Sequence, residues 1–542
     1  MKQISKLGIV LFLLTNLWGT MAQEQTPIIT IVRSDAASSD LVLGIHSRSD
    51  FSIDWGDGTL DKYPGRNYGT NEIKGQCSSN TIKIYGTSND IVSLYLGNDD
   101  KGNGIRALDV TQLKKLRFLY CQSNELEQLD LSSGYMLEEL NVARNNLKEL
   151  NLKQSPLLNM IVCWGNRLTT LDLSENSRLE AIRCEYNQIT QLEVDHLDKL
   201  TALRCGNNPI SQLSIKGTPL LQQLHINNTS INEISVTHLT DLRVLDASHC
   251  RLQNIDLSNN KELRKLILNG CGLNNISINQ NQQLEQVEVM DNQLTYIDLK
   301  GNPLIQDLRC SKNFIEKLDI SGLRQLKYLF CEHLNLKELN LQNNVELREL
   351  LASGNQIKNI NLSHTPKLYL LWLTNNQLQE IDITPTPELF SLFLSGNQLS
   401  AHSLKSIVQL LPDVSQIQVD PNRKWWKRWL RVKGNPGTSE IDFTPLKGKG
   451  WFVDVLDHWQ APEQIQEPSV QKNPIKIENG SIVWQNNSVG ILEVYTTAGQ
   501  LILRSNQQEE TLSQLSEGWF LARAIDCNNH KEYILKFFVF GK

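Results

Sequence analysis

Residues 158–178 have the sequence LNMIVCWGNRLTTLDLSENSR, and the pattern of this stretch returns every 21 residues. A leucine, replaced once by Ile305, opens each of fourteen units between Leu116 and Leu389, and no insertion disturbs the spacing. Apolar residues occupy positions 1, 4, 6, 11, 14 and 16 of the unit, and asparagine occupies position 9 in ten units. One unit of this length cannot bury its own apolar face, so the period predicts a solenoid whose coils pack on one another.

The spacing of leucines and asparagines resembles that of leucine-rich repeats. Side chains alternate along a strand, so we expect positions 4 and 6 to point inward and positions 3, 5 and 7 to face solvent on a concave parallel sheet. A unit of 21 residues leaves little room for helix, which predicts a mostly β fold with a short extended run on the convex side. The position 9 asparagines are expected to bond to backbone groups of adjacent coils, in a ladder interrupted at Thr229, Cys250, Cys271 and Leu334.

Cysteine takes the place of a core hydrophobe at position 6 of six units. These residues are Cys121, Cys163, Cys184, Cys205, Cys310 and Cys331. In-register strands place equivalent side chains about 4.8 Å apart, whereas a disulfide requires Cβ atoms about 3.8 Å apart. We therefore predict a structural ladder of buried free thiols. The alternatives are disulfides and a zinc site on Cys163, Cys184 and Cys205, which a straight row of thiols disfavours because it gives no tetrahedral cage. No metal or cofactor is expected.

The first 22 residues have the features of a secretory signal peptide. Lys2 and Lys6 precede an apolar run at residues 7–18, and a small-residue cleavage site follows at residues 20–22. No later stretch reaches the about 18 apolar residues that a transmembrane helix needs, so no membrane span is expected. A formal charge of -6 argues against a nucleic-acid partner.

The chain divides into further segments by its patterning. We expect an N-terminal β module at 23–90, an atypical capping repeat at 91–115, fourteen repeats at 116–400, a cap at 401–458, a linker at 459–474 and a C-terminal β-sandwich at 475–542. Asp54 and Asp57 lie in a turn signal, DWGDG, and a calcium role for them with Asp61 is the alternative to a structural turn. The insert with Asp99, Asp100 and Asn103 favours an exposed turn over a cation site.

The C-terminal segment resembles the sorting domain of type IX secretion cargo. The resemblance lies in residues 493–501 (EVYTTAGQL), 517–521 (EGWFL) and 536–542 (KFFVFGK), although Trp519 stands where that family usually has valine. The whole architecture resembles that of internalin-J-like surface proteins of Bacteroidetes. The resemblance implies export to the outer-membrane surface of a Gram-negative cell, or release from it. It also implies adhesion to proteins or glycoproteins on host or bacterial surfaces, with a role in biofilm, and no catalytic residue.

Position 5 of the repeat identifies two zones of the concave sheet. In the first, Arg183 and Arg204 lie side by side with Trp164 and Tyr186, and Glu185 is nearby. The second is an apolar ladder with two flanking residues: Phe330, Leu351, Trp372 and Phe393, then Tyr328 and Leu370. Aromatic residues and arginine are enriched where proteins bind one another, so we predict partner binding here. The alternatives are that the cap covers the ladder and that the arginines pair with Glu185.

The cap contains a basic, tryptophan-rich stretch at residues 423–433. Its candidate contact residues are Arg423, Lys424, Trp425, Trp426, Lys427, Arg428 and Trp429. A cap hairpin packed on the last repeat explains this stretch, and a surface for anionic glycans or lipids is the alternative function. No catalytic motif such as G-x-S-x-G or H-E-x-x-H is present, and the histidines share no repeat position, so the sequence predicts a binding protein and not an enzyme.

Overall fold

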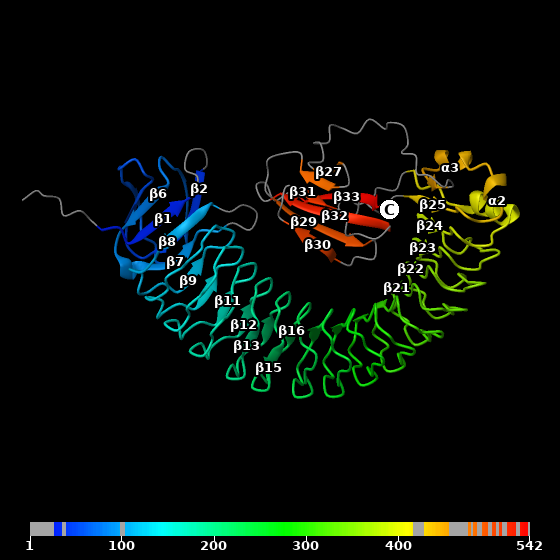
Figure 1. Cartoon of the computed structure of the whole chain (residues 1–542), viewed down its shortest axis with the longest axis horizontal. Coiled ribbons are helices and arrows are strands. Elements are labelled where there is room, and N and C mark those ends of the chain that lie inside the picture. Colours follow the sequence, from blue (N-terminus) through cyan, green and yellow to red (C-terminus); the bar gives the residue numbers. More distant parts are fainter. Residues whose placement is uncertain are drawn as a thin grey trace, which may run out of the picture. The chain divides into compact units, whose positions relative to one another are not determined.

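The computed structural model describes residues 26–34, 40–97, 103–415 and 428–454, together with a set of strands between residues 475 and 539. The described residues up to 454 form one compact unit, and the later strands belong to a second unit (Figure 1). Both units are mostly β, as predicted.

The N-terminal part of the first unit contains two sheets with a common apolar core. One sheet has the strand order β4-β3-β6-β1-β8. Its strands are β1 (Ile29–Arg33), β3 (Phe51–Asp54), β4 (Asp61–Tyr63), β6 (Thr81–Tyr85) and β8 (Ile105–Asp109). The other begins with β5 (Asn71–Gln76), β2 (Asp40–Ser47) and β7 (Ile91–Tyr95), and η1 (Ser88–Asp90) precedes β7. Ile31, Ile45 and Ile84 are completely buried between the sheets.

The second of these sheets continues into the solenoid. β2 pairs antiparallel with β7, with Ile45 opposite Leu94. β7 in turn pairs parallel with β9, with Leu94 opposite Leu119. The segment expected to form one atypical repeat is therefore shared between sheets, because β8 pairs with β1 and places Leu108 opposite Ile31. This arrangement covers the first edge of the solenoid sheet, which would otherwise offer unpaired backbone groups to another chain.

Each of the fourteen repeats contributes one three-residue strand, at positions 3 to 5, to the long sheet. In Figure 1 these strands follow the inner side of the curve of the first unit. They are β9 (Phe118–Tyr120), β10 (Glu139–Asn141), β11 (Met160–Val162), β12 (Ala181–Arg183), β14 (Ala202–Arg204), β16 (Gln223–His225), β17 (Val244–Asp246), β18 (Lys265–Ile267), β19 (Gln286–Glu288), β20 (Asp307–Arg309), β21 (Tyr328–Phe330), β22 (Glu349–Leu351), β23 (Leu370–Trp372) and β24 (Ser391–Phe393). All pair parallel and in register, for example Ile161 with Ile182.

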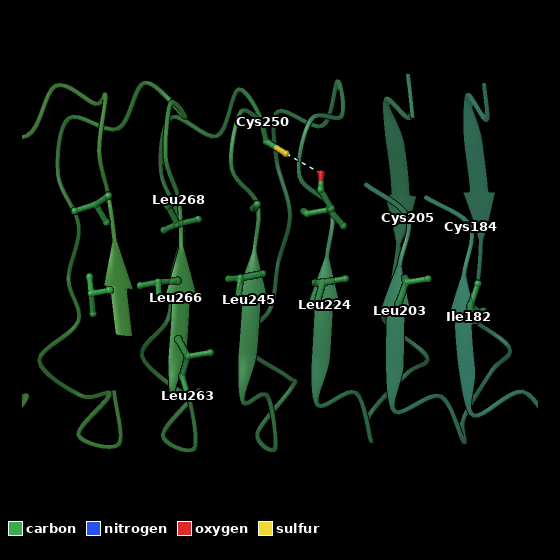
Figure 2. Packing of buried hydrophobic residues seen from close by; sticks show 14 of the residues in the cluster. Ile182, Cys184, Leu203, Cys205, Leu224, Leu245, Cys250, Leu263, Leu266 and Leu268 are labelled. Carbon is green, nitrogen blue, oxygen red and sulfur yellow. Dashed lines mark hydrogen bonds between the residues drawn. The ribbon is translucent and has the colours of Figure 1, made fainter. Parts of the chain in front are cut away.

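The core follows the repeat positions that the sequence predicts. Leu158, Ile161, Cys163 and Leu168, at positions 1, 4, 6 and 11, are all completely buried. Figure 2 shows equivalent position 4 side chains, from Ile182 to Leu266, in one row across successive coils. The predicted leucine-rich-repeat solenoid is confirmed. Among residues 103–415, the expected extended run of the convex side forms paired strands in two coils, β13 (Gln191–Glu193) and β15 (Gln212–Ser214).

The position 9 asparagines form the ladder that holds adjacent coils together. The Asn166 amide donates to the carbonyls of Val142 and Cys163 at 2.9 and 3.0 Å, and its Oδ1 accepts the N–H of Leu147 at 3.0 Å. The expected interruptions are partial. Cys250 replaces asparagine but its Sγ still donates to the carbonyl of Ile226 at 3.1 Å (Figure 2).

The six position 6 cysteines are completely buried and none forms a disulfide. Burial raises the pKa of the Cys121 and Cys310 thiols to about 12. The same cause raises the pKa of Cys163 and Cys205 still further. Such thiols stay protonated at neutral pH and pack as small apolar side chains.

We expect the Cys121 thiol to make stability fall in alkali. Its pKa rises from 9.0 to about 12 on folding, so its contribution is complete below pH 9 and is lost as pH increases toward 12. Over that window the free energy of unfolding should fall by about 1.4 kcal/mol per pH unit for this group. Urea titrations of Cys121→Val under reducing conditions should show a shallower alkaline slope than wild type by this amount. Equal slopes would contradict the burial of an ionisable thiol here.

A cap closes the C-terminal end of the sheet. α2 (Ala401–Leu410) starts at the N-cap Ser400 and buries Leu404 and Ile407. β25 (Trp429–Arg431) then pairs parallel with β24, and β26 (Phe452–Asp454) pairs with β25. Between them lie η3 (Thr438–Glu440) and α3 (Thr444–Gly448).

The second unit contains two antiparallel sheets, a three-stranded one in the order β27-β28-β31 and a four-stranded one in the order β30-β29-β32-β33. Its strands are β27 (Ile475–Glu478), β28 (Ser481–Trp484), β29 (Gly490–Thr496), β30 (Leu501–Ser505), β31 (Glu509–Thr511), β32 (Gly518–Asp526) and β33 (Glu532–Val539). Across the described parts of both units, no helix has the length and apolar character to cross a membrane.

Candidate binding surface

The apolar ladder of position 5 forms a continuous stack on β21 to β24. We call Phe330, Leu351, Trp372 and Phe393 the aromatic row. Strand register places each member opposite the next. The rings of Trp372 and Phe393 are stacked, with centroids 4.6 Å apart and planes 6° from parallel. Stacking fixes the orientation of both rings before any partner arrives.

A guanidinium lies at each end of the aromatic row. Arg309 lies on β20, opposite Phe330 of β21, and its guanidinium carbon is 4.6 Å from the centroid of the Phe330 ring. Arg431 lies on β25, opposite Phe393 of β24, and its guanidinium carbon is 4.4 Å from the centroid of the Phe393 ring. Sequence reasoning missed Arg431, because it comes 38 residues after Phe393 and lies outside the 21-residue frame. The triplet Trp429-Leu430-Arg431, which repeats the position 3 to 5 pattern, is the signal that could have found it.

Carboxylates hold both guanidiniums in place. Arg309 makes two bonds to Asp307, at 3.0 and 2.9 Å, and lies 3.8 Å from Glu288. Arg431 lies 3.7 Å from Asp454. Burial lowers the pKa of Arg431, and the charge of Asp454 opposes that shift. The ends of the row are therefore charged but internally paired.

Stacking makes the apolar zone less exposed than the sequence predicts. Leu351 and Leu370 are only 8% and 4% exposed, so the expectation that both face solvent is wrong. Phe330, Trp372 and Tyr328 remain partly exposed. The physical reason is that in-register side chains cover one another's faces and leave mainly their outer edges accessible. This correction reduces the expected area but keeps the row on the surface.

The first zone brings together the predicted residues and one more arginine. Arg183 and Arg204 are opposite each other on β12 and β14. Trp164 lies between Arg144, whose guanidinium is 4.7 Å from the ring centroid, and Arg183, at 6.0 Å. We call Arg144, Arg183 and Arg204 the arginine cluster. Arg144 was missed although it occupies position 8, the repeat position of Tyr186, and that shared position is the signal that could have found it.

The polar contacts of the arginine cluster within the protein are long or involve a neutral group. The closest approach of Arg183 to Glu185 is 3.5 Å, and Arg204 donates to the neutral Oε1 of Gln223 at 3.2 Å. Tyr186 is exposed next to them and has a left-handed backbone, with φ of 55°. The predicted network with Glu185 therefore exists but involves one of the three guanidiniums.

The basic stretch of the cap is only partly within the described residues. Arg423, Lys424, Trp425, Trp426 and Lys427 lie outside them. Arg428 donates to the carbonyl of Ser415 at 3.3 Å. Trp429 lies in β25, with its ring 5.6 Å from that of Phe452. These two residues are thus used in building the cap.

Two of the three aspartates considered for calcium with the DWGDG turn, Asp54 and Asp57, accept hydrogen bonds within the turn, and the third, Asp61, lies in β4. Asp54 accepts the N–H groups of Gly56 and Gly58, and Asp57 accepts that of Thr59. Asp99 and Asp100 lie outside the described residues, whereas Asn103 donates to the carbonyl of Leu96 at 2.7 Å. In the part of the chain that the structure describes, no three His, Cys, Asp or Glu side chains group closely enough to hold a metal ion.

Two solved structures of bacterial repeat proteins have a similar fold. The functional domain of InlJ from Listeria monocytogenes, which includes a cysteine ladder, aligns with a TM-score of 0.58 at 22% identity, over 85% of this chain and 93% of that one. The LRR protein LIC12759 from Leptospira interrogans aligns with a TM-score of 0.55 at 23% identity, over 66% of this chain and 94% of that one. No protein-family model and no curated protein matches the sequence. These likenesses establish the leucine-rich-repeat fold.

Proposed function

We propose that this chain is a secreted or cell-surface adhesin-type protein that binds a protein on a host or bacterial surface through the concave sheet of its solenoid. The observation that carries the proposal is the aromatic row, a preorganised stack of large side chains on a sheet face. Preorganised aromatic side chains bind at low entropic cost, because their rotamers are already fixed. Binding, and not catalysis, is the role that such a surface supports.

The geometry of the row favours a protein partner over a glycan. A sugar ring stacks on an open aromatic face, but Phe393 has Trp372 on one side and Arg431 on the other. The accessible edges suit the apolar and backbone groups of a protein surface. The glycan- or lipid-binding alternative rests on residues 423–433, of which Arg428 and Trp429 bond or pack within the cap.

The route to the surface is part of the proposal. The apolar N-terminal segment supports export across the inner membrane, and the resemblance of residues 475–542 to type IX sorting domains supports transport to the outer-membrane surface of a Bacteroidetes cell. Adhesion and biofilm support are the consequences expected of a binding protein at that place.

Replacing Trp372 and Phe393 together by alanine should weaken partner binding. Both residues are of the types that dominate binding energy at protein interfaces. The affinity of the full chain for the surface protein that it binds should therefore fall by at least about tenfold. The measurement is a titration of wild type and variant on bacterial and host-cell surface fractions. Circular dichroism should show the same secondary structure in both.

The control is Tyr296→Ala with Phe314→Ala. These aromatics are 59% and 55% exposed, but they lie at repeat positions 13 and 10, outside the strands of the sheet. The control variant should bind as wild type does. If the Trp372 and Phe393 variant is folded and binds as tightly as wild type, the concave row is not the binding surface. Loss of binding on neutralising Arg428 instead would favour the cap alternative.

A further inference from the structure

We propose that the arginine cluster receives an acidic segment of the protein partner, with glutamate or aspartate side chains opposite Arg183 and Arg204. This inference rests on the proposed function and adds the chemistry of the partner. It starts from an unfavourable arrangement, because like charges directly opposite each other on neighbouring strands destabilise a sheet. Arg183 and Arg204 are in this position, and the Arg183 side chain is 44% exposed.

The other acidic and basic residues of the same row lie within 3.8 Å of a partner of the other kind. His225 and Asp246 lie 3.8 Å apart on adjacent strands. Arg309 makes a two-pronged contact with Asp307. The arginine cluster differs, because among the described residues only Arg183 of the three has a carboxylate contact, with Glu185 at 3.5 Å, whereas Arg204 bonds to the neutral Gln223. At position 5 of the described repeats, two arginines that share one carboxylate contact therefore occur in only one segment of the sheet.

The surroundings keep the guanidiniums of this cluster accessible. Position 3 of the same two strands holds Ala181 and Ala202, and position 7 of the Arg204 coil holds Gly206. Trp164 supports Arg144 and Arg183 from the side through its ring. Arginine presents planar N–H groups that bind carboxylates with two parallel hydrogen bonds, so an acidic side chain fits this segment. A sugar ring that stacks on Trp164 does not fit, because Arg144 and Arg183 already lie against this ring.

The distance between the two zones defines the partner further. Six coils separate Arg204 from Phe330, which corresponds to about 29 Å at 4.8 Å per coil. An extended segment of about nine residues covers that length. The inferred partner segment is acidic at the end nearer the N-terminal coils and apolar at the end that reaches the aromatic row.

The test measures binding of a fluorescein-labelled ten-residue polyglutamate peptide to the full chain by fluorescence anisotropy. Arg183→Gln with Arg204→Gln should raise the Kd at least about tenfold, because two charge-assisted contacts are lost. The matched control is Arg167→Gln with Arg251→Gln, which removes the same charge from two exposed residues at repeat position 10, outside the strands. The control should change the Kd by less than about twofold.

Each other outcome contradicts the inference. Equal weakening of binding in both double variants would show that polyglutamate is attracted by net charge alone. If polyglutamate does not bind to wild type, the arginine cluster is not a site for acidic segments. Tighter binding of a heparin oligosaccharide, lost in the same variant, would replace an acidic peptide by a sulfated glycan. Because polyglutamate does not need the aromatic row, Trp372→Ala with Phe393→Ala should leave its Kd unchanged, so this inference and the proposed function can fail separately.

Discussion

Replacing Asn166 and Asn187 together by alanine is expected to lower the free energy of unfolding by more than the sum of the two single changes. Each asparagine alone should contribute about 3 kcal/mol, from one backbone N–H left without a partner and two lost hydrogen bonds. The N–H groups concerned belong to Leu147 and Leu168, each 3.0 Å from its asparagine oxygen.

The extra loss comes from a shared carbonyl. The oxygen of Cys163 accepts from the amide of Asn166 at 3.0 Å and from that of Asn187 at 3.1 Å. A single substitution leaves this buried oxygen one donor, whereas the double substitution leaves it none. An unsatisfied buried carbonyl adds about 1–3 kcal/mol, which should appear as a coupling energy between the two sites.

The matched control for the coupling pairs Asn166 with Asn313. Asn313 makes the same set of bonds, to the carbonyls of Val289 and Cys310 and the N–H of Leu294, but shares none with Asn166. Sites this far apart are additive within about 0.5 kcal/mol. Denaturant titration gives the energies, and hydrogen exchange of the Leu147 and Leu168 amides reports the local opening. If the energies of the Asn166 and Asn187 substitutions are additive, the shared carbonyl of Cys163 does not couple the two sites.

The regular part of the fold could be predicted because one period carries it. A fixed 21-residue spacing places equivalent residues on neighbouring strands, so the register of Arg183 with Arg204 and the burial of Cys163 both follow from sequence alone. The frame gives no information where it is broken. Arg431 continues the aromatic row from within the cap, and β8 leaves the solenoid to pair with β1.

Side-chain exposure was harder to predict than register. Leu351 was placed on the correct face, but its burial depends on the size of Phe330 and Trp372 on the two adjacent strands. A second ladder was missed for a related reason. Asn176, at position 19, donates to the carbonyls of Leu152 and Ser155 in the preceding coil. Asparagine occupies that position in five coils, and other coils use serine, threonine, leucine or glycine, so the pattern is weaker than at position 9.

Three glycines at position 18 provide a graded test of how closely the coils approach one another. A Cβ added at Gly217 would lie 1.6 Å from the carbonyl oxygen of Asp195, and one at Gly301 would lie 2.4 Å from that of Asn279. At Gly322 nothing lies within 4 Å. The closest approach, at Gly217, lies just after the pair of convex strands. β13 ends two residues before Asp195, β15 ends three residues before Gly217, and the pairing of these two strands draws the two coils together.

Gly217→Ala is therefore expected to destabilise the solenoid by about 3 kcal/mol, because the methyl group meets rigid backbone and neither coil can move without breaking the β13–β15 pairing. Gly301→Ala should cost less, and Gly322→Ala should be neutral or stabilising by up to about 1 kcal/mol, through the reduced freedom of the unfolded chain. Urea denaturation of the three variants supplies the ranking. The control matters because all three changes are chemically identical and occupy the same repeat position. Equal effects at Gly217 and Gly322 would mean that backbone freedom, and not the separation between coils, determines the requirement for glycine.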